Sequence, residues 1–91
     1  MADEVDYLEN FRTNLRLLRT YKGLSKTGLA RKLKCSPQYI AALENHNVKK
    51  IPSLEKLVEI AEALGTTPGR MLDVNASDFH QYIERKYIPT D

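Results

Sequence analysis

Apolar residues recur at three- or four-residue intervals along most of this chain. Two long stripes show this spacing: Val5, Leu8, Phe11, Leu15 and Leu18 in the first, and Leu54, Leu57, Val58, Ala61 and Leu64, widened by Ile60, in the second. Such spacing places each set on one face of an α-helix, and we expect the second set to form the stripe that faces the core. It predicts an all-α protein with one helix over about residues 6–21 and another over about 54–64.

Two shorter apolar stripes lie between these helices. Leu29 and Leu33 are four positions apart, and Ile40 and Leu43 are three apart. A serine suited to an N-cap precedes each stripe, so each stripe predicts a short helix. We expect these helices to cover residues 26–33 and 37–45. With a turn of three to four residues between them, they outline a helix-turn-helix, which can hold its second helix toward a DNA major groove.

The end of the chain predicts two further helices. Thr67-Pro68 starts a short one that ends near Leu72. A later segment over residues 77–87 places Phe79, Tyr82 and Ile83 on one helical face. We expect this face to contribute to a dimer interface, and packing against its own domain is the alternative.

Charge is distributed unevenly along the chain, although the net charge is only +2. Residues 1–11 hold four acids and no bases, residues 12–50 hold ten Lys and Arg against Glu44 alone, and residues 51–91 hold four bases against seven acids. A solvated surface also carries lysines, but a basic stretch centred on a helix-turn-helix suits phosphates. We therefore expect three parts: an acidic extension over 1–10 that can include the start of the first helix, a DNA-binding domain over 11–73, and a helical tail over 74–91.

Several functional classes find no support in the residues. The single cysteine, Cys35, excludes an intrachain disulfide or a Cys-rich zinc site, and we expect it to be a small buried residue in a reducing cytoplasm. The start has no signal-peptide pattern, and no stretch approaches membrane-spanning length. His46 and His80 are far apart, and no nucleophile stands beside a base. We expect neither an enzyme nor a bound cofactor or metal.

A set of short motifs gives a more specific indication. The motifs are Phe11, Leu15-Arg16-Leu17-Leu18-Arg19, Gly23-Leu24-Ser25, Tyr39-Ile40, Leu43-Glu44-Asn45, Pro52-Ser53-Leu54, Ile60-Ala61, Ala63-Leu64-Gly65 and Met71-Leu72. Together they resemble the lambda-repressor-like, Cro/Xre-type helix-turn-helix domain over about two thirds of the chain. The resemblance implies a five-helix domain, here with an additional C-terminal helix. It also implies a buried ion pair between Arg19 and Glu44.

The resemblance places the first turn of the helix over 37–45 against base edges of duplex DNA. The residues at these positions are Ser36, Gln38, Tyr39, Ala41 and Ala42. Gln38 can pair with adenine, the alanine methyls can contact thymine methyls, and the tyrosine hydroxyl can reach a base or a phosphate. The alternative for the two alanines is that they are core residues. The alternative for Ser36 is that its side chain caps its own helix.

Contacts with the phosphate backbone of DNA are expected from residues that flank this helix. They are Lys26 at the start of the preceding helix, Asn45, and the loop residues Lys49 and Lys50. Free surface lysines are the alternative. Two further positions depart from the family pattern. Lys34 replaces a glycine in the turn, so the backbone there is either left-handed or takes a different turn. His46 replaces the glycine that often follows Glu-Asn in the family, and Asn47 is expected to supply the left-handed cap instead.

The function implied is that of a transcriptional regulator. We expect a repressor that binds a palindromic operator as a homodimer, in the cytoplasm. The alternative is a protein-interaction module, such as an antitoxin-like or anti-repressor protein, that uses the same fold to hold a protein partner. The small number of base-contacting side chains favours the alternative, whereas the basic middle of the chain favours the regulator.

Overall fold

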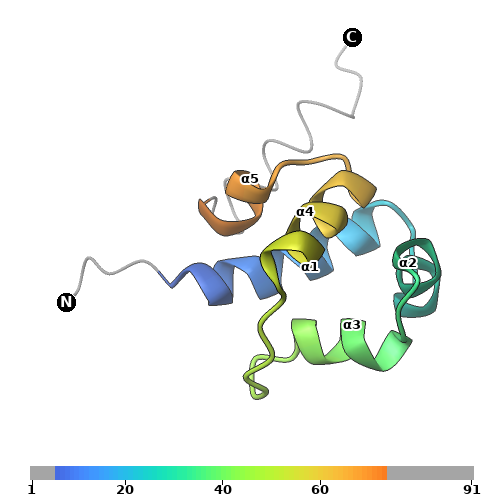
Figure 1. The fold of residues 1–91 in the computed structure, drawn as a ribbon, viewed down its shortest axis with the longest axis horizontal. Helices are drawn as coiled ribbons and strands as arrows, with labels where there is room; N and C mark the ends of the chain where they lie inside the picture. Colours follow the sequence, from blue (N-terminus) through green and yellow to red (C-terminus); the bar gives the residue numbers. More distant parts are fainter. Residues whose placement is uncertain (1–5, 74–91) are drawn as a thin grey trace, which may run out of the picture.

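The computed structural model describes residues 6–73, which form five α-helices and no strand (Figure 1). The helices are α1 (Tyr7–Tyr21), α2 (Lys26–Leu33), α3 (Pro37–Glu44), α4 (Leu54–Ala63) and α5 (Pro68–Asp73). The expected all-α class is confirmed, and each helix boundary lies within about one residue of its predicted position. The expected C-terminal helix, with Phe79, Tyr82 and Ile83, lies outside the described residues, as does Val5.

Local capping explains why these boundaries were predictable. The carboxylate of Asp6 accepts a hydrogen bond from the main-chain N–H of Glu9 at 3.0 Å, which starts α1. Serines at the N-caps of α2, α3 and α4 each accept from the N–H three residues later, at 2.9 to 3.1 Å. A side-chain oxygen at this position satisfies an N–H that the helix itself leaves unpaired. The chain therefore specifies its helix starts from neighbouring residues alone.

The helices enclose one hydrophobic core. Its largest fully buried members are Phe11, Leu15, Leu18, Leu29, Ile40, Leu43, Ile60, Leu64 and Met71. The prediction for Leu54 was wrong, because its side chain is 76% exposed, and Val58 is only half-buried. Leu54 is the first residue of α4, and helical side chains lean toward the N-terminus, where only an exposed loop precedes it. Ile60 lies fully buried and carries the core contact instead.

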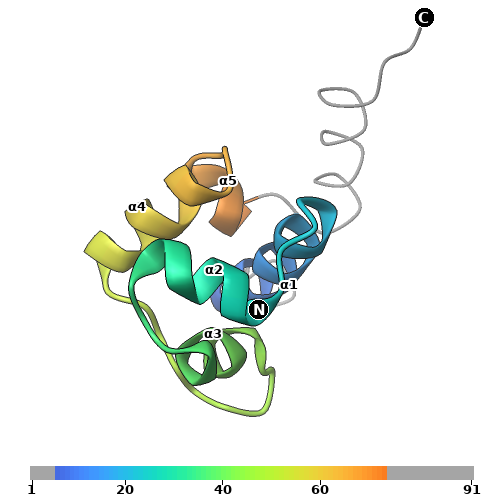
Figure 2. The same ribbon diagram turned by 90° about the vertical axis from the view of Figure 1, so that its right-hand side faces the viewer.

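Helix α1 contacts both α3 and α5, while α4 contacts α2 and α5. The views agree that α3 lies along one edge of the molecule, next to α2 (Figures 1 and 2). Amide groups of α1 also reach α5: the Nδ2 atoms of Asn10 and Asn14 donate to the main-chain oxygens of Leu72 and Met71, both at 2.9 Å. These bonds satisfy carbonyl groups at the C-terminal end of α5 and attach that end to α1.

The turn between α2 and α3 uses a lysine where the family pattern has a glycine. Lys34 is left-handed, with φ 58° and ψ 45°, and is the one described non-glycine residue with a positive φ.

The loop after α3 differs from the prediction. Asn47 does not have a positive φ, so the expectation that it forms a left-handed cap was wrong. Asn45 turns that loop instead, because its side-chain oxygen accepts from the N–H of Asn47 at 2.8 Å. Cys35 was expected to be buried but is only half-buried, since it lies in a surface turn between exposed Lys34 and Ser36.

Candidate nucleic-acid interface

Helix α3 is fixed to α1 by a buried ion pair. Arg19 forms a bidentate contact with Glu44: its Nε donates to Oε2 at 2.6 Å, and its Nη2 donates to Oε1 at 3.1 Å. The two side chains are only 10% and 4% exposed. The remaining Nη1 of Arg19 donates to the main-chain oxygen of Leu24 at 2.8 Å. The hydrogen bond that Arg19 donates to Glu44 is the main cause that raises the pKa of Arg19.

A second arginine of α1 binds the same C-terminal end of α3. Arg12 is 3% exposed and donates from Nη1 to the main-chain oxygens of Leu43 at 2.8 Å and Ala42 at 3.2 Å. Its Nη2 donates to the main-chain oxygen of Lys50 at 3.2 Å. The last carbonyl groups of a helix have no partners within it, and its C-terminus favours a cation. Arg12 therefore positions both the end of α3 and the loop that follows it.

Sequence reasoning missed this role of Arg12 and counted it among bases suited to phosphate. A signal was present, because Arg12 lies four residues after Leu8 and three before Leu15, on the apolar face of α1. Arg19, seven residues later, shares that face. Of the ten bases in residues 12–50, these two are buried and the other eight are exposed. The basic surface is smaller than the sequence suggested but remains substantial.

The first turn of α3 leaves one polar side chain fully available. Gln38 is exposed, while Ile40 is completely buried. Ser36 is exposed, but its hydroxyl oxygen accepts from the N–H of Tyr39 at 3.1 Å, so its first partner is its own helix. Ala41 and Ala42 are half-buried and keep part of their surface accessible. The geometry leaves Gln38 as the principal hydrogen-bonding group on this face.

Exposed lysines lie at the start of α2 and in the loop after α3. Lys26 is exposed as the first residue of α2, where the helix N-terminus favours an anion. Lys49 and Lys50 are exposed in the loop after α3. The ammonium group of Lys50 lies 5.5 Å from the centre of the Tyr39 ring, within range of a cation–π contact. Burial of the half-buried Tyr39 is the main cause that raises the pKa of its hydroxyl.

The loop itself is held by several groups. The main chain at Lys50 is bound by Arg12, and the side-chain oxygen of Asn45 caps the turn at Asn47. The imidazole of His46 contacts the carboxylate of Glu9 on α1. Asn45 is exposed, so its amide group keeps access to a ligand. The structure thus places Lys50 beside Tyr39, with Gln38 exposed in the first turn of the same helix.

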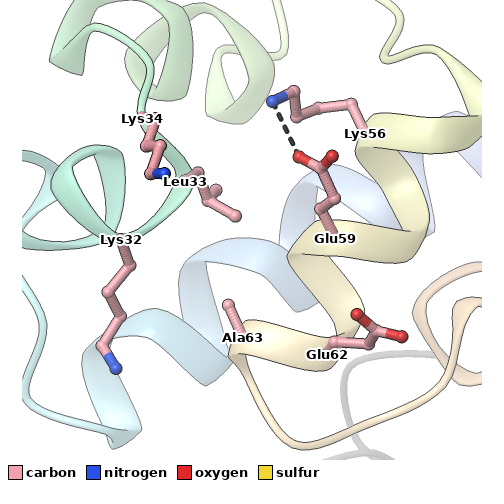
Figure 3. Close-up of a pocket in the computed structure, with 7 residues that line it drawn as sticks. All are labelled: Lys32, Leu33, Lys34, Lys56, Glu59, Glu62 and Ala63. Atoms are coloured by element: carbon pink, nitrogen blue, oxygen red, sulfur yellow. Dashed lines mark hydrogen bonds and ion pairs between the residues drawn. The ribbon is translucent and has the colours of Figure 1, made fainter.

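A separate hollow of about 610 Å³ lies between the C-terminal end of α2 and α4 (Figure 3). It is lined by Lys32, Leu33, Lys34, Lys56, Glu59, Glu62 and Ala63. Lys56 bonds Glu59 at 2.9 Å, and this bond is the main cause that raises the lysine pKa. The hollow mixes three lysines with two glutamates, so it lacks the uniformly positive charge that phosphate binding favours.

Between Asp6 and Asp73, no three His, Cys, Asp or Glu side chains gather as a metal site would require. None of the helices in that part of the chain combines the length and apolar character needed to cross a membrane. The expectations about His80 and the tail lie outside this part.

Comparisons with solved structures find the same fold in regulators and in an enzyme. The hypothetical transcription factor NHTF from Neisseria has a TM-score of 0.70 and 25% identity, over 87% of this chain and 92% of that one. The clp gene regulator ClgR from Corynebacterium glutamicum has a TM-score of 0.66 over 92% and 97%, and its 24% identity shows the fold alone. Hydroxypropylphosphonic acid epoxidase from S. wedmorenis has a TM-score of 0.65 and 28% identity over 76% of this chain.

This chain spans only about a third of the epoxidase, 36% of its length. No curated protein matches the sequence. A family model described as helix-turn-helix matches residues 15–70, more than half of the chain and the whole of α2, α3 and α4. The resemblance expected from the motifs is confirmed: this chain belongs to the helix-turn-helix family.

Proposed function

We propose that this chain is a sequence-specific regulator of transcription that binds duplex DNA, acts as a repressor, and binds a palindromic operator as a homodimer. The family match and the likeness to NHTF support DNA binding and transcription regulation as the functional class. The observation that carries the proposal is the exposed Gln38 in the first turn of α3, a helix whose C-terminal end is held by both Arg12 and Arg19.

In this proposal α3 enters the major groove and its first turn contacts base edges. The Gln38 amide can donate to N7 and accept from the N6 amino group of adenine, a two-bond contact. The methyl groups of Ala41 and Ala42 contact thymine methyls, and Tyr39 contacts a base or a phosphate. Ser36 is a weaker candidate, because it already accepts from the N–H of Tyr39. This chemistry favours A·T pairs over guanine.

Phosphate contacts fix the domain on the duplex. Lys26 and the N-terminal end of α2 approach one stretch of backbone, and Lys49, Lys50 and the Asn45 amide approach another. The exposed bases of residues 12–50 attract the protein to DNA at long range. The likeness to the epoxidase covers 36% of that protein and supports no catalytic activity here, so we propose a non-enzymatic regulator that needs no cofactor.

A homodimer places two copies of α3 in successive major grooves, about 34 Å apart along the duplex. The two-fold symmetry of the protein then matches a palindromic site. Repression follows sterically, because the bound dimer excludes polymerase from overlapping DNA. The proposed setting is the cytoplasm, where DNA and a reduced Cys35 are compatible.

Protection mapping on the DNA around the protein's own gene tests the proposal. We expect two protected half-sites with two-fold symmetry, separated by about one helical turn. A single protected half-site would retain DNA binding and contradict the dimer. If no duplex binds more tightly than about 10⁻⁴ M, the weak limit of non-specific binding, the protein-interaction module becomes the better account.

A further inference from the structure

An apolar groove of about 360 Å³ lies on the surface formed by α1, the loop before α4, and the ends of α4 and α5. Tyr7, Ile51 and Leu54 form its accessible lining, at 52%, 68% and 76% exposed, and Leu72 of α5 borders it. The described residues contain five large apolar side chains that are exposed, and three of these five line this groove. Apolar side chains that gather in this way mark a surface that another group covers.

The described chain ends beside this groove. Asp73, the last described residue, directly follows Leu72, and eighteen residues of sequence come after it. These include Phe79, Tyr82 and Ile83, whose spacing suits one apolar helical face. The groove offers apolar surface without a partner among the described residues, and the tail sequence offers an apolar face of matching chemistry.

We propose that the groove binds the C-terminal segment of a second copy of this chain, and that two copies exchange these segments reciprocally. This inference rests on the proposed homodimer and names the surface that forms it. The face that carries Phe79, Tyr82 and Ile83 lies in the groove of the partner copy, against Tyr7, Ile51 and Leu54. The exchange is isologous, so it closes at two copies.

Buried area favours a second copy over the same chain as the source of the segment. A stable dimer buries about 1,200–2,000 Å² in total, and an aromatic side chain buries about 150–250 Å². Two reciprocal contacts, each with two aromatic rings, an isoleucine and the groove wall, reach this range. If each tail filled its own groove, only Tyr21 and Val48, 39% and 40% exposed, would remain as large exposed apolar residues in the described part.

Disulfide trapping in the full-length protein tests which chain supplies the segment. In a Cys35→Ser background, one protein carries Leu54→Cys and a second carries Ile83→Cys, and the two are mixed and oxidised. We expect a mixed disulfide dimer on a non-reducing gel, identified by mass spectrometry. Tyr21→Cys replaces Leu54→Cys in the matched control, because Tyr21 is exposed and outside the groove, and it should give far less product.

A single chain with both Leu54→Cys and Ile83→Cys distinguishes the remaining outcomes. A covalent dimer supports exchange between copies. A monomer with an internal disulfide overturns the proposal in favour of the chain's own tail, and absence of any disulfide shows that the tail does not occupy the groove. Wild-type binding to duplex DNA is measured separately, so failure of this inference is distinguishable from failure of the proposed regulator.

Sedimentation of Leu54→Glu gives an independent readout. A carboxylate in an apolar interface is costly to bury, so we expect the dimer dissociation constant to rise by at least about tenfold. Leu54 is exposed, and circular dichroism should therefore show an unchanged fold. Tyr21→Glu should leave self-association unaltered. A Leu54→Glu protein that associates like wild type would overturn the proposal.

Discussion

The Nη1 atom of Arg12 lies 2.8 Å from the main-chain oxygen of Leu43, so an arginine of α1 closes the C-terminal end of α3. Arg12→Met should remove hydrogen bonds to three carbonyl groups and leave those acceptors without their buried donor. Hydrogen bonds to charged groups are worth about 1.5–3 kcal/mol each, so we expect a loss of at least about 2 kcal/mol in urea unfolding.

Arg16→Met is the matched control, because Arg16 is exposed one turn further along α1. It should change stability by less than about 0.5 kcal/mol. DNA affinity should fall in Arg12→Met even under conditions where the protein remains folded, since the loop at Lys50 loses its anchor. Equal effects of the two substitutions would show that Arg12 has no positioning role.

The Arg19–Glu44 pair should show strong coupling in a double-mutant cycle. Each single alanine change leaves one buried charge without its partner, at a cost of about 3–5 kcal/mol. The double change removes both charges, so it should destabilise by clearly less than the sum of the singles. Denaturant unfolding of the four proteins measures the coupling. Additive effects below about 1 kcal/mol would mean that the two side chains act independently.

Lys34→Gly should stabilise the protein. A left-handed backbone costs a non-glycine residue about 1–2 kcal/mol, and the larger chain entropy of glycine offsets about 0.5–1 kcal/mol of the gain. The net expectation is an increase of up to about 1.5 kcal/mol in the free energy of unfolding. Lys32→Gly, inside α2, is the control and should destabilise by about 1 kcal/mol. Loss of stability in both variants would contradict the assigned backbone conformation.

The salt dependence of DNA binding should identify the phosphate contacts. Each neutralised phosphate contributes about 0.9 to the slope of log affinity against log salt, so alanine at Lys26, Lys49 and Lys50 together should lower it by about 3. The control is a second triple variant that also loses three positive charges. It carries Lys32→Ala, Lys34→Gly and Lys56→Ala, which lie around the hollow between α2 and α4. Similar slopes for both triple variants would remove Lys26, Lys49 and Lys50 from the interface.

The sequence predicted most of the fold because its signals are local. A cap such as Ser36 acts three residues along the chain, and the apolar stripes act within one helix, so both are readable without tertiary contacts. Leu54 was misplaced because a stripe does not show which end of a helix extends beyond the core.

Long-range polar contacts were the part that spacing could predict least well. The carbonyl partners of Arg12 lie 30 to 38 residues away, and main-chain oxygens carry no residue type for a pattern to detect. Arg19 and Glu44 were paired only because the family resemblance placed them together. The groove was likewise invisible in the sequence, since it forms where three helices and a loop meet.

Selection of binding sites from random duplexes, with wild type and Gln38→Ala side by side, tests the central claim most directly. We expect A·T-rich half-sites from wild type. On the preferred site Gln38→Ala should lose about 1–3 kcal/mol while non-specific binding stays nearly unchanged, because the amide contacts a base edge rather than the backbone. Guanine at the positions that α3 protects, or full discrimination by Gln38→Ala, would contradict the account and assign specificity to Tyr39 or to DNA shape.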